Sequence, residues 1–211
     1  MCHMEAVLDI YARPYDATQP VVCLDETSRQ LLGETRPPQS MAVGGAARHD
    51  PEYVRGGVAQ LFLVTEPLRG WRHVAVGAKR TRREFAQCVK ELVDVHYPHA
   101  ERIVLVMDHL NIHSPASLYA AFPPAEAKRL ATKLEIHHTP KHGSWLNMAE
   151  LELSVLARQC LCQRLPDQAA MEAAVTAWAD RRNVATRTID WQFTTTDART
   201  KLRRLYPVFD A

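Results

Sequence analysis

Short apolar runs bounded by polar turns predict five strands along this chain. The runs at 21–27, 102–109 and 134–140 have the length and the Val, Ile and Leu content of short strands. Two more runs lie within 57–79 on either side of the turn-like sequence EPLRG, which indicates a β-hairpin. The run at 102–109 contains the uninterrupted apolar sequence IVLVM, typical of a central strand that is buried on both faces.

Apolar residues recur at helical spacing in most of the remaining chain. Thr81 and Asp167 are candidate N-caps, and proline occupies the first turn of two segments. The stretch 33–57 is rich in Gly, Pro and Arg and is expected to be an extended loop. The predicted helices are 4–12, 81–98, a short one opening at Ser114 and Pro115, 123–134, 147–162 and 166–185.

The order of these elements predicts an α/β fold with a mixed five-stranded sheet, three antiparallel strands followed by two parallel ones. Helices are expected on both faces. Residues 1–20 are interpreted as an N-terminal connector and 21–165 as the core. Residues 166–211 are expected to add a C-terminal helix and a basic tail to the same domain.

Three acidic residues stand where strands and helices end or begin. Asp25 ends the first strand, Asp108 ends the central strand, and Glu150 opens a late helix. If the first and fourth strands are neighbours, these carboxylates meet at one edge of the sheet and raise each other's pKa values. Mg²⁺ or Mn²⁺ would remove that repulsion, and two ions about 4 Å apart suit phosphoryl transfer.

Each of the three acids also has a purely structural interpretation. Asp25 and Asp108 could be turn or cap residues, and Glu150 lies three residues after Asn147, the spacing of a capping box. Glu152 is interpreted as a surface or salt-bridge residue. The joint placement of the acids is what favours a site.

Positive charge is concentrated in two segments, although the formal net charge of the chain is only +2. The segments 72–83 and 181–204 could follow a phosphate backbone or simply be solvated faces. Trp145 could stack on an extruded base, although a core or loop-anchoring role is the alternative that we favour. The candidate DNA-binding residues are Arg80, Arg82, Arg83, Lys141, His142, Trp145, Arg181 and Arg182.

Composition is that of a globular protein, with 46% hydrophobic and 24% charged residues. Five scattered cysteines form no zinc-knuckle spacing and favour a reduced, cytoplasmic compartment. The N-terminus shows no signal-peptide pattern, and no apolar run approaches the roughly 18 residues of a membrane span.

Around the three acids, the chain contains the motifs VVCLDE, VLVMDHLNIHS and TPKHGSWLNMAE. In these motifs, the chain resembles the catalytic domain of DDE transposases. The resemblance is to the bacterial insertion-sequence branch of the mariner-like superfamily, and it covers about residues 10–207. It implies a ribonuclease H-like fold and a catalytic, metal-binding triad of Asp25, Asp108 and Glu150, with two Mg²⁺ or Mn²⁺ ions. His113 and Asn147 match positions that would support this site.

The same resemblance implies hydrolysis of DNA at transposon ends, followed by transfer of the freed 3′-hydroxyl into target DNA. The transposon ends and the target would both be double-stranded DNA. The enzyme would act as a homodimer in the bacterial cytoplasm, at the nucleoid. Relatives carry an N-terminal helix-turn-helix portion that nothing here resembles. The chain is therefore expected to be the catalytic half of a truncated or split product. Two departures from the family pattern are His109 after the second acid and Met148 after the asparagine.

Three other functions compete with this interpretation. The chain could be a non-catalytic DNA-binding or regulatory remnant of a decayed element. It could be another nuclease of the same fold, of the Holliday-junction or ribonuclease H type. A zinc site is also conceivable, drawn from His109, His113, His137, His138 and His142.

Overall fold

The structure is a computed structural model that describes residues 1–37, 41 and 50–206. Its strands are β1 (Val21–Glu34), β2 (Tyr53–Glu66), β3 (Trp71–Gly77), β4 (Ile103–Met107) and β5 (Leu134–His138). Its α-helices are α1 (Cys2–Tyr11), α2 (Arg82–Glu91), α3 (Pro115–Ala121), α4 (Pro124–Thr132), α5 (Met148–Gln159), α6 (Gln168–Val184) and α7 (Thr195–Lys201). A π-helix, η1 (Leu92–His96), follows α2, and two 3-10 turns are η2 (Ser144–Leu146) and η3 (Arg203–Leu205).

The five strands form one sheet in the order β3-β2-β1-β4-β5. β1 pairs antiparallel with β2 and β2 with β3, whereas β4 is parallel to both β1 and β5. The predicted sheet of three antiparallel and two parallel strands is therefore confirmed. All five residues of β4 are buried, as its uninterrupted apolar run indicated.

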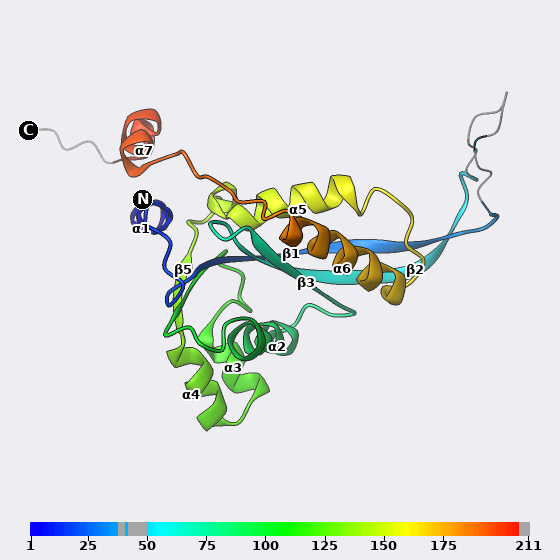
Figure 1. Cartoon of the computed structure of the whole chain (residues 1–211), viewed down its shortest axis with the longest axis horizontal. Helices are drawn as coiled ribbons and strands as arrows, with labels where there is room; N and C mark the ends of the chain where they lie inside the picture. Colours follow the sequence, from blue (N-terminus) through cyan, green and yellow to red (C-terminus); the bar gives the residue numbers. More distant parts are fainter. Residues whose placement is uncertain (38–40, 42–49, 207–211) are drawn as a thin grey trace, which may run out of the picture.

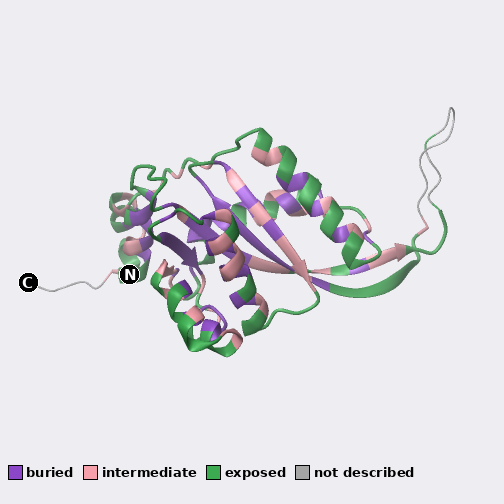
Figure 2. Cartoon of the chain, turned by 60° about the horizontal axis from the view of Figure 1, so that its bottom comes forward, coloured by how far each residue is buried: buried purple, intermediate pink, exposed green. Residues whose placement is uncertain are grey.

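Helices cover both faces of the sheet (Figure 1). One apolar core joins α1, α5 and α6 to one face, and a second joins α2, α3 and α4 to the other. Figure 2 shows the buried strands between these helical layers. The predicted caps are confirmed, because Thr81 caps α2 in a capping box with Glu84 and Asp167 caps α6.

The stretch expected to be a loop from residue 33 to residue 57 is partly strand, so that prediction was wrong at both ends. β1 continues to Glu34 and β2 begins at Tyr53, and these two residues are paired. The ladder hydrogen bonds satisfy the backbone without a core, which explains why this ribbon extends beyond the helices (Figure 2). At its base a Cβ on Gly56 would lie 2.2 Å from the Pro166 carbonyl oxygen, so only glycine permits this approach. The middle of the expected loop lies outside the described residues.

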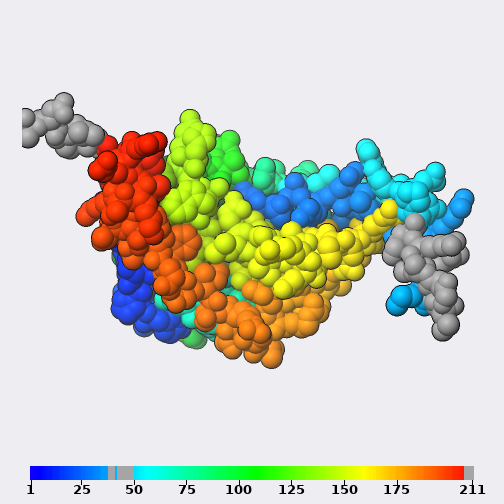
Figure 3. Space-filling view, turned by 90° about the horizontal axis from the view of Figure 1, so that it is seen from above, coloured from blue at the N-terminus to red at the C-terminus, as the bar shows by residue number. Residues whose placement is uncertain are grey.

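The first twenty residues, expected to be a connector, contribute a helix to the core. α1 buries five side chains there, among them Tyr11, whose hydroxyl donates to the Leu146 carbonyl oxygen at 2.7 Å. α7, which the sequence did not predict, lies against α1 through an ion pair of Arg199 with Glu5. Figure 3 shows this end of the molecule, where red and blue segments lie together beside the yellow α5 and orange α6.

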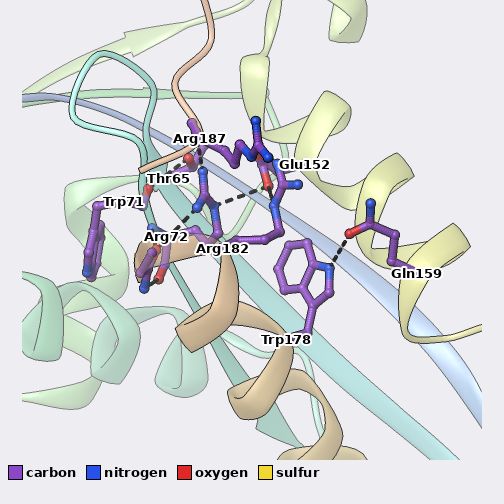
Figure 4. Close-up of polar contacts among 9 residues, drawn as sticks. Thr65, Trp71, Arg72, Glu152, Gln159, Trp178, Arg182 and Arg187 are labelled. Atoms are coloured by element: carbon purple, nitrogen blue, oxygen red, sulfur yellow. Dashed lines mark hydrogen bonds and ion pairs between the residues drawn. The ribbon is translucent and has the colours of Figure 1, made fainter. Parts of the chain in front are cut away.

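A buried ion cluster joins β3, α5 and α6 (Figure 4). Arg72 Nε lies 3.2 Å from Glu152 Oε2, and Arg182 Nη2 donates to Glu152 Oε1 at 2.8 Å. The side chains of Arg72 and Glu152 are 0% and 2% exposed. Arg72 also donates to the Arg187 carbonyl oxygen and shares backbone hydrogen bonds with the Asn183 side chain. Of the two interpretations of Glu152, the salt bridge holds, and it lies in the interior.

We predict that Glu152→Ala lowers the free energy of unfolding by about 3–5 kcal/mol, because it leaves a buried guanidinium unpaired. Urea unfolding followed by circular dichroism measures this change. Glu5→Ala is the matched control, since it removes an ion pair whose arginine side chain is 63% exposed, and it should change stability little. Equal effects of the two substitutions would contradict the structural role of the cluster.

Candidate active site

Asp25 and Asp108 meet because β1 and β4 are parallel neighbours. Cys23 lies opposite Val106 in this pair, and two residues further along each chain come Asp25 and Asp108. Side chains alternate along a strand, so Asp25 points to the same face as Cys23, the face that α5 covers. The expected convergence of the two aspartates at one sheet edge is therefore what the topology produces.

Glu150 is brought to this edge by the start of α5. Asn147 is fully buried, and its Oδ1 accepts a hydrogen bond from the Ala149 amide at 3.1 Å, as an N-cap does. Its Nδ2 donates to the Leu24 carbonyl oxygen at 2.8 Å. One side chain therefore ties the first turn of α5 to the residue that precedes Asp25. Glu150 lies in that first turn and is exposed.

The surroundings of Asp25, including the other two carboxylates, raise its pKa. Burial raises the pKa of Asp25 to about 7, although the Glu26 amide, which donates to Oδ1 at 2.8 Å, opposes the rise. Repulsion from the carboxylates of Glu150 and Asp108 adds to the rise in this pKa. An acid that resists ionisation beside two others is the arrangement that a bound cation would relieve.

His113 holds Asp108 in place from the opposite face of the sheet. Its Nδ1 lies 2.7 Å from Asp108 Oδ1, and its Nε2 lies 3.1 Å from Glu26 Oε2 without hydrogen-bond geometry. Burial lowers the pKa of His113, but the contacts with Asp108 and Glu26 outweigh burial and raise it to about 9. The contact with His113 in turn lowers the pKa of Asp108. His113 therefore acts as a charged bridge between two acids.

Glu26 is the residue of this site that sequence reasoning missed. It follows Asp25 on β1, points to the other face and has a side chain that is only 2% exposed. Its sequence neighbourhood carries no signal for this role, because the partner His113 lies 87 positions later in the chain. Only the folded sheet brings the two together.

The donor set of the three acids fits hard divalent cations. All the donors are carboxylate oxygens, which Mg²⁺ and Mn²⁺ prefer. The oxygens of Asp25, Asp108 and Glu150 do not all lie within 4.8 Å of one another, so a single coordination sphere would not gather them without movement.

Most of the candidate DNA-binding side chains are exposed. Arg80, Arg82 and Arg83 are exposed at the start of α2, Lys141, His142 and Trp145 are exposed before α5, and Arg181 is exposed near the end of α6. The ring of Trp145 stacks on that of Trp191, with 6.5 Å between the ring centroids, and Trp145 is 48% exposed. This arrangement supports the loop-anchoring interpretation of Trp145. Arg182 differs from the others, because its guanidinium is held by Glu152 and lies over Trp178. Arg182 thus has a structural contact, and its expected contact with DNA stays a prediction.

The five histidines proposed as a zinc site do not assemble into one. His109 stacks on His138 at 4.4 Å, but both nitrogens of His113 face carboxylates, and His138 Nε2 contacts the His113 carbonyl oxygen. Within the described part of the chain, no three of them bring ligand atoms within 4.8 Å of one another. His137 Nε2 lies 2.8 Å from Glu135 Oε1, so His137 also has a carboxylate partner.

A mixed five-stranded sheet with acids at the ends of β1 and β4 and at the head of a late helix is the arrangement of the ribonuclease H-like fold class. Residues 20–172, well over half of the chain, match the sequence profile described as DDE superfamily endonuclease. The chain belongs to this family. No curated protein matches it.

Solved structures of Mos1 mariner transposase share the fold. The Mos1 strand transfer complex has a TM-score of 0.58 at 13% identity, over 88% of this chain and 56% of the Mos1 chain. The Mos1 paired end complex with Mn has a TM-score of 0.56 at 13% identity, over 88% of this chain and 57% of the Mos1 chain. The Mos1 paired end complex with Mg has a TM-score of 0.53 at 12% identity, over the same shares of the two chains. This chain therefore spans just over half of the Mos1 chain, and the predicted ribonuclease H-like fold is confirmed. None of the described helices is long and apolar enough to cross a bilayer.

We predict that Asn147→Ala lowers the free energy of unfolding by about 1–3 kcal/mol, because it removes both a cap and the partner of a buried carbonyl. Thermal and urea unfolding measure the loss. Asp167→Ala removes only a cap, that of α6, and should cost about 1 kcal/mol. If Asn147→Ala proves no more costly than this control, the tie to β1 contributes nothing.

Proposed function

We propose that this chain is the catalytic domain of a transposase that hydrolyses DNA phosphodiesters at transposon ends and joins the freed 3′-hydroxyl to target DNA. The observation that carries the proposal is the placement of Asp25, Asp108 and Glu150 at one edge of a DDE-family sheet. Mos1 transposase, whose solved structures include a paired end complex and a strand transfer complex, supports the proposal by analogy of fold.

The side chains of Asp25, Asp108 and Glu150 would hold two Mg²⁺ or Mn²⁺ ions. When bound, such ions activate the attacking oxygen and stabilise the leaving oxygen of an in-line displacement. The chain itself supplies position. Asn147 holds the start of α5 beside Leu24, and His113 orients the Asp108 carboxylate, so the ligands are in place before DNA arrives.

DNA binding would use the exposed cations near this edge. Arg80 lies close to the site, since its Nη1 is 4.0 Å from Glu26 Oε1, and Arg82 and Arg83 follow it on α2. Lys141 and His142 precede the helix that carries Glu150. We assign these two groups to contacts with double-stranded DNA, and by analogy we propose a bacterial insertion-sequence origin and a homodimer acting on paired ends.

We predict that Asp25→Asn, Asp108→Asn and Glu150→Gln each reduce metal-dependent nicking on the order of 100-fold or more, because each removes a metal ligand of nearly unchanged shape. The assay uses supercoiled DNA carrying the inverted repeats that flank the gene, with Mg²⁺, Mn²⁺ or EDTA. Glu172→Gln, an exposed acid on α6, is the matched control. Wild-type nicking by the three variants would refute the triad. DNA binding without nicking by any protein, wild type included, would favour the non-catalytic remnant.

We predict that the double substitution Arg82→Ala and Arg83→Ala lowers DNA affinity and reduces the slope of log K against log salt by about 0.9 for each lost phosphate contact. Fluorescence anisotropy at several salt concentrations measures both quantities. Arg102→Ala is the control, since that exposed arginine precedes the start of β4, at the opposite end of the strand from Asp108. An unchanged slope in the double variant would remove the start of α2 from the DNA interface.

A further inference from the structure

A second cluster of metal-ligating side chains lies on the face of the sheet opposite to Asp25. It consists of His73 on β3, Glu91 at the end of α2 and His96 at the end of η1. Among the described residues, this trio alone brings one ligand atom from each of three His, Cys, Asp or Glu side chains within 4.8 Å of one another. We propose that these three residues form a zinc site.

The distances suit a tetrahedral ion. His73 Nε2 lies 3.5 Å from Glu91 Oε1, and His96 Nε2 lies 3.7 Å from the same oxygen. Ligand atoms about 2.0–2.1 Å from zinc at a tetrahedral angle are separated by about 3.4 Å. The three groups therefore need only small movements to share one ion, and a water molecule would complete the coordination.

The buried Nε2 of His96 makes no hydrogen bond to any residue that the structure describes, which is unusual for a buried imidazole nitrogen. Its ring is confined by Trp71, whose centroid is 4.8 Å away, and by His73 at 4.6 Å. Because Glu91 and His73 remain partly exposed, an ion could reach the site from solvent.

The π-helix explains how Glu91 and His96 come to point at one place. Residues five apart on an α-helix point about 140° away from each other. In η1 the backbone bonds run from each residue to the fifth one before it, as the Tyr97 amide does to the Leu92 carbonyl oxygen at 2.9 Å. Positions five apart then lie on one side of the helix, and such π-segments occur frequently at functional sites.

The chemistry of the ligands separates this site from the one at Asp25. Two imidazoles with one carboxylate form a recurrent zinc set, whereas the oxygen-only triad favours Mg²⁺ or Mn²⁺. His73 pairs with Val64, which pairs with Leu24, so the cluster lies two strands away from β1 at the level of Leu24. An ion here would join the edge strand β3 to the end of α2.

The test is zinc binding to the metal-stripped full chain, measured by competition with a chromophoric chelator and by the visible spectrum of the Co²⁺ form. We expect one site per chain, with affinity reduced about 100-fold or more in His73→Ala and in His96→Ala. His99→Ala, an exposed histidine three residues further on, should bind as wild type does, and so should Asp25→Asn.

Equal affinity in wild type, His73→Ala and His96→Ala would overturn the proposal, and so would loss of the site in Asp25→Asn alone. His73 is on an edge strand and its side chain is 32% exposed, so His73→Ala keeps the test valid if His96→Ala does not fold. Zinc should also raise the Tm of wild type but not that of His73→Ala. None of these readouts depends on nicking.

Discussion

The burial of one charged side chain, Glu152, sets the rotation of α5 and with it the direction of Glu150. Glu152 contacts Arg72 and Arg182 in the interior, and breaking such a buried contact is strongly destabilising. Residues two apart on an α-helix point about 200° away from each other. Holding Glu152 against β3 and α6 therefore turns Glu150 to the opposite side, where it is exposed. An ion cluster outside the site decides where a candidate metal ligand points.

Rotation of α5 does not by itself place Glu150 beside the aspartates, and the Asn147 side chain supplies the missing constraint. Its hydrogen bond to the Leu24 carbonyl oxygen ties the start of the helix to β1, one residue before Asp25. The parallel pairing of Cys23 on β1 with Val106 on β4 places Asp108 beside Asp25, because each aspartate lies two residues beyond this pair. Each acid is thus positioned by a contact of a near neighbour in sequence. Such a scaffold can hold repelling carboxylates together before any cation arrives.

The features that could be predicted from the sequence are those carried by local pattern. Apolar runs indicated the strands, and capping residues such as Thr81 and Asp167 indicated where helices begin. Sequence motifs that resemble a known family pointed to the three acids. The extension of β1 and β2 was not predictable from composition, because ladder pairing rather than burial forms it. The roles of Arg72 and Glu26 depend on partners far along the chain, and no local pattern specifies such pairs.

Because side chains alternate along β1, its two neighbouring acids lie on opposite faces of the sheet. Asp25 points toward α5, whereas Glu26 points toward α2 and reaches Asp108 only through His113. A change on the α2 face can therefore act on the acidic edge through this one bridge or through the strands themselves. The His73 cluster lies on a different strand, since β2 separates β3 from β1. An ion there would therefore join the edge of the sheet to the end of α2, and its binding can be measured apart from that of the three acids.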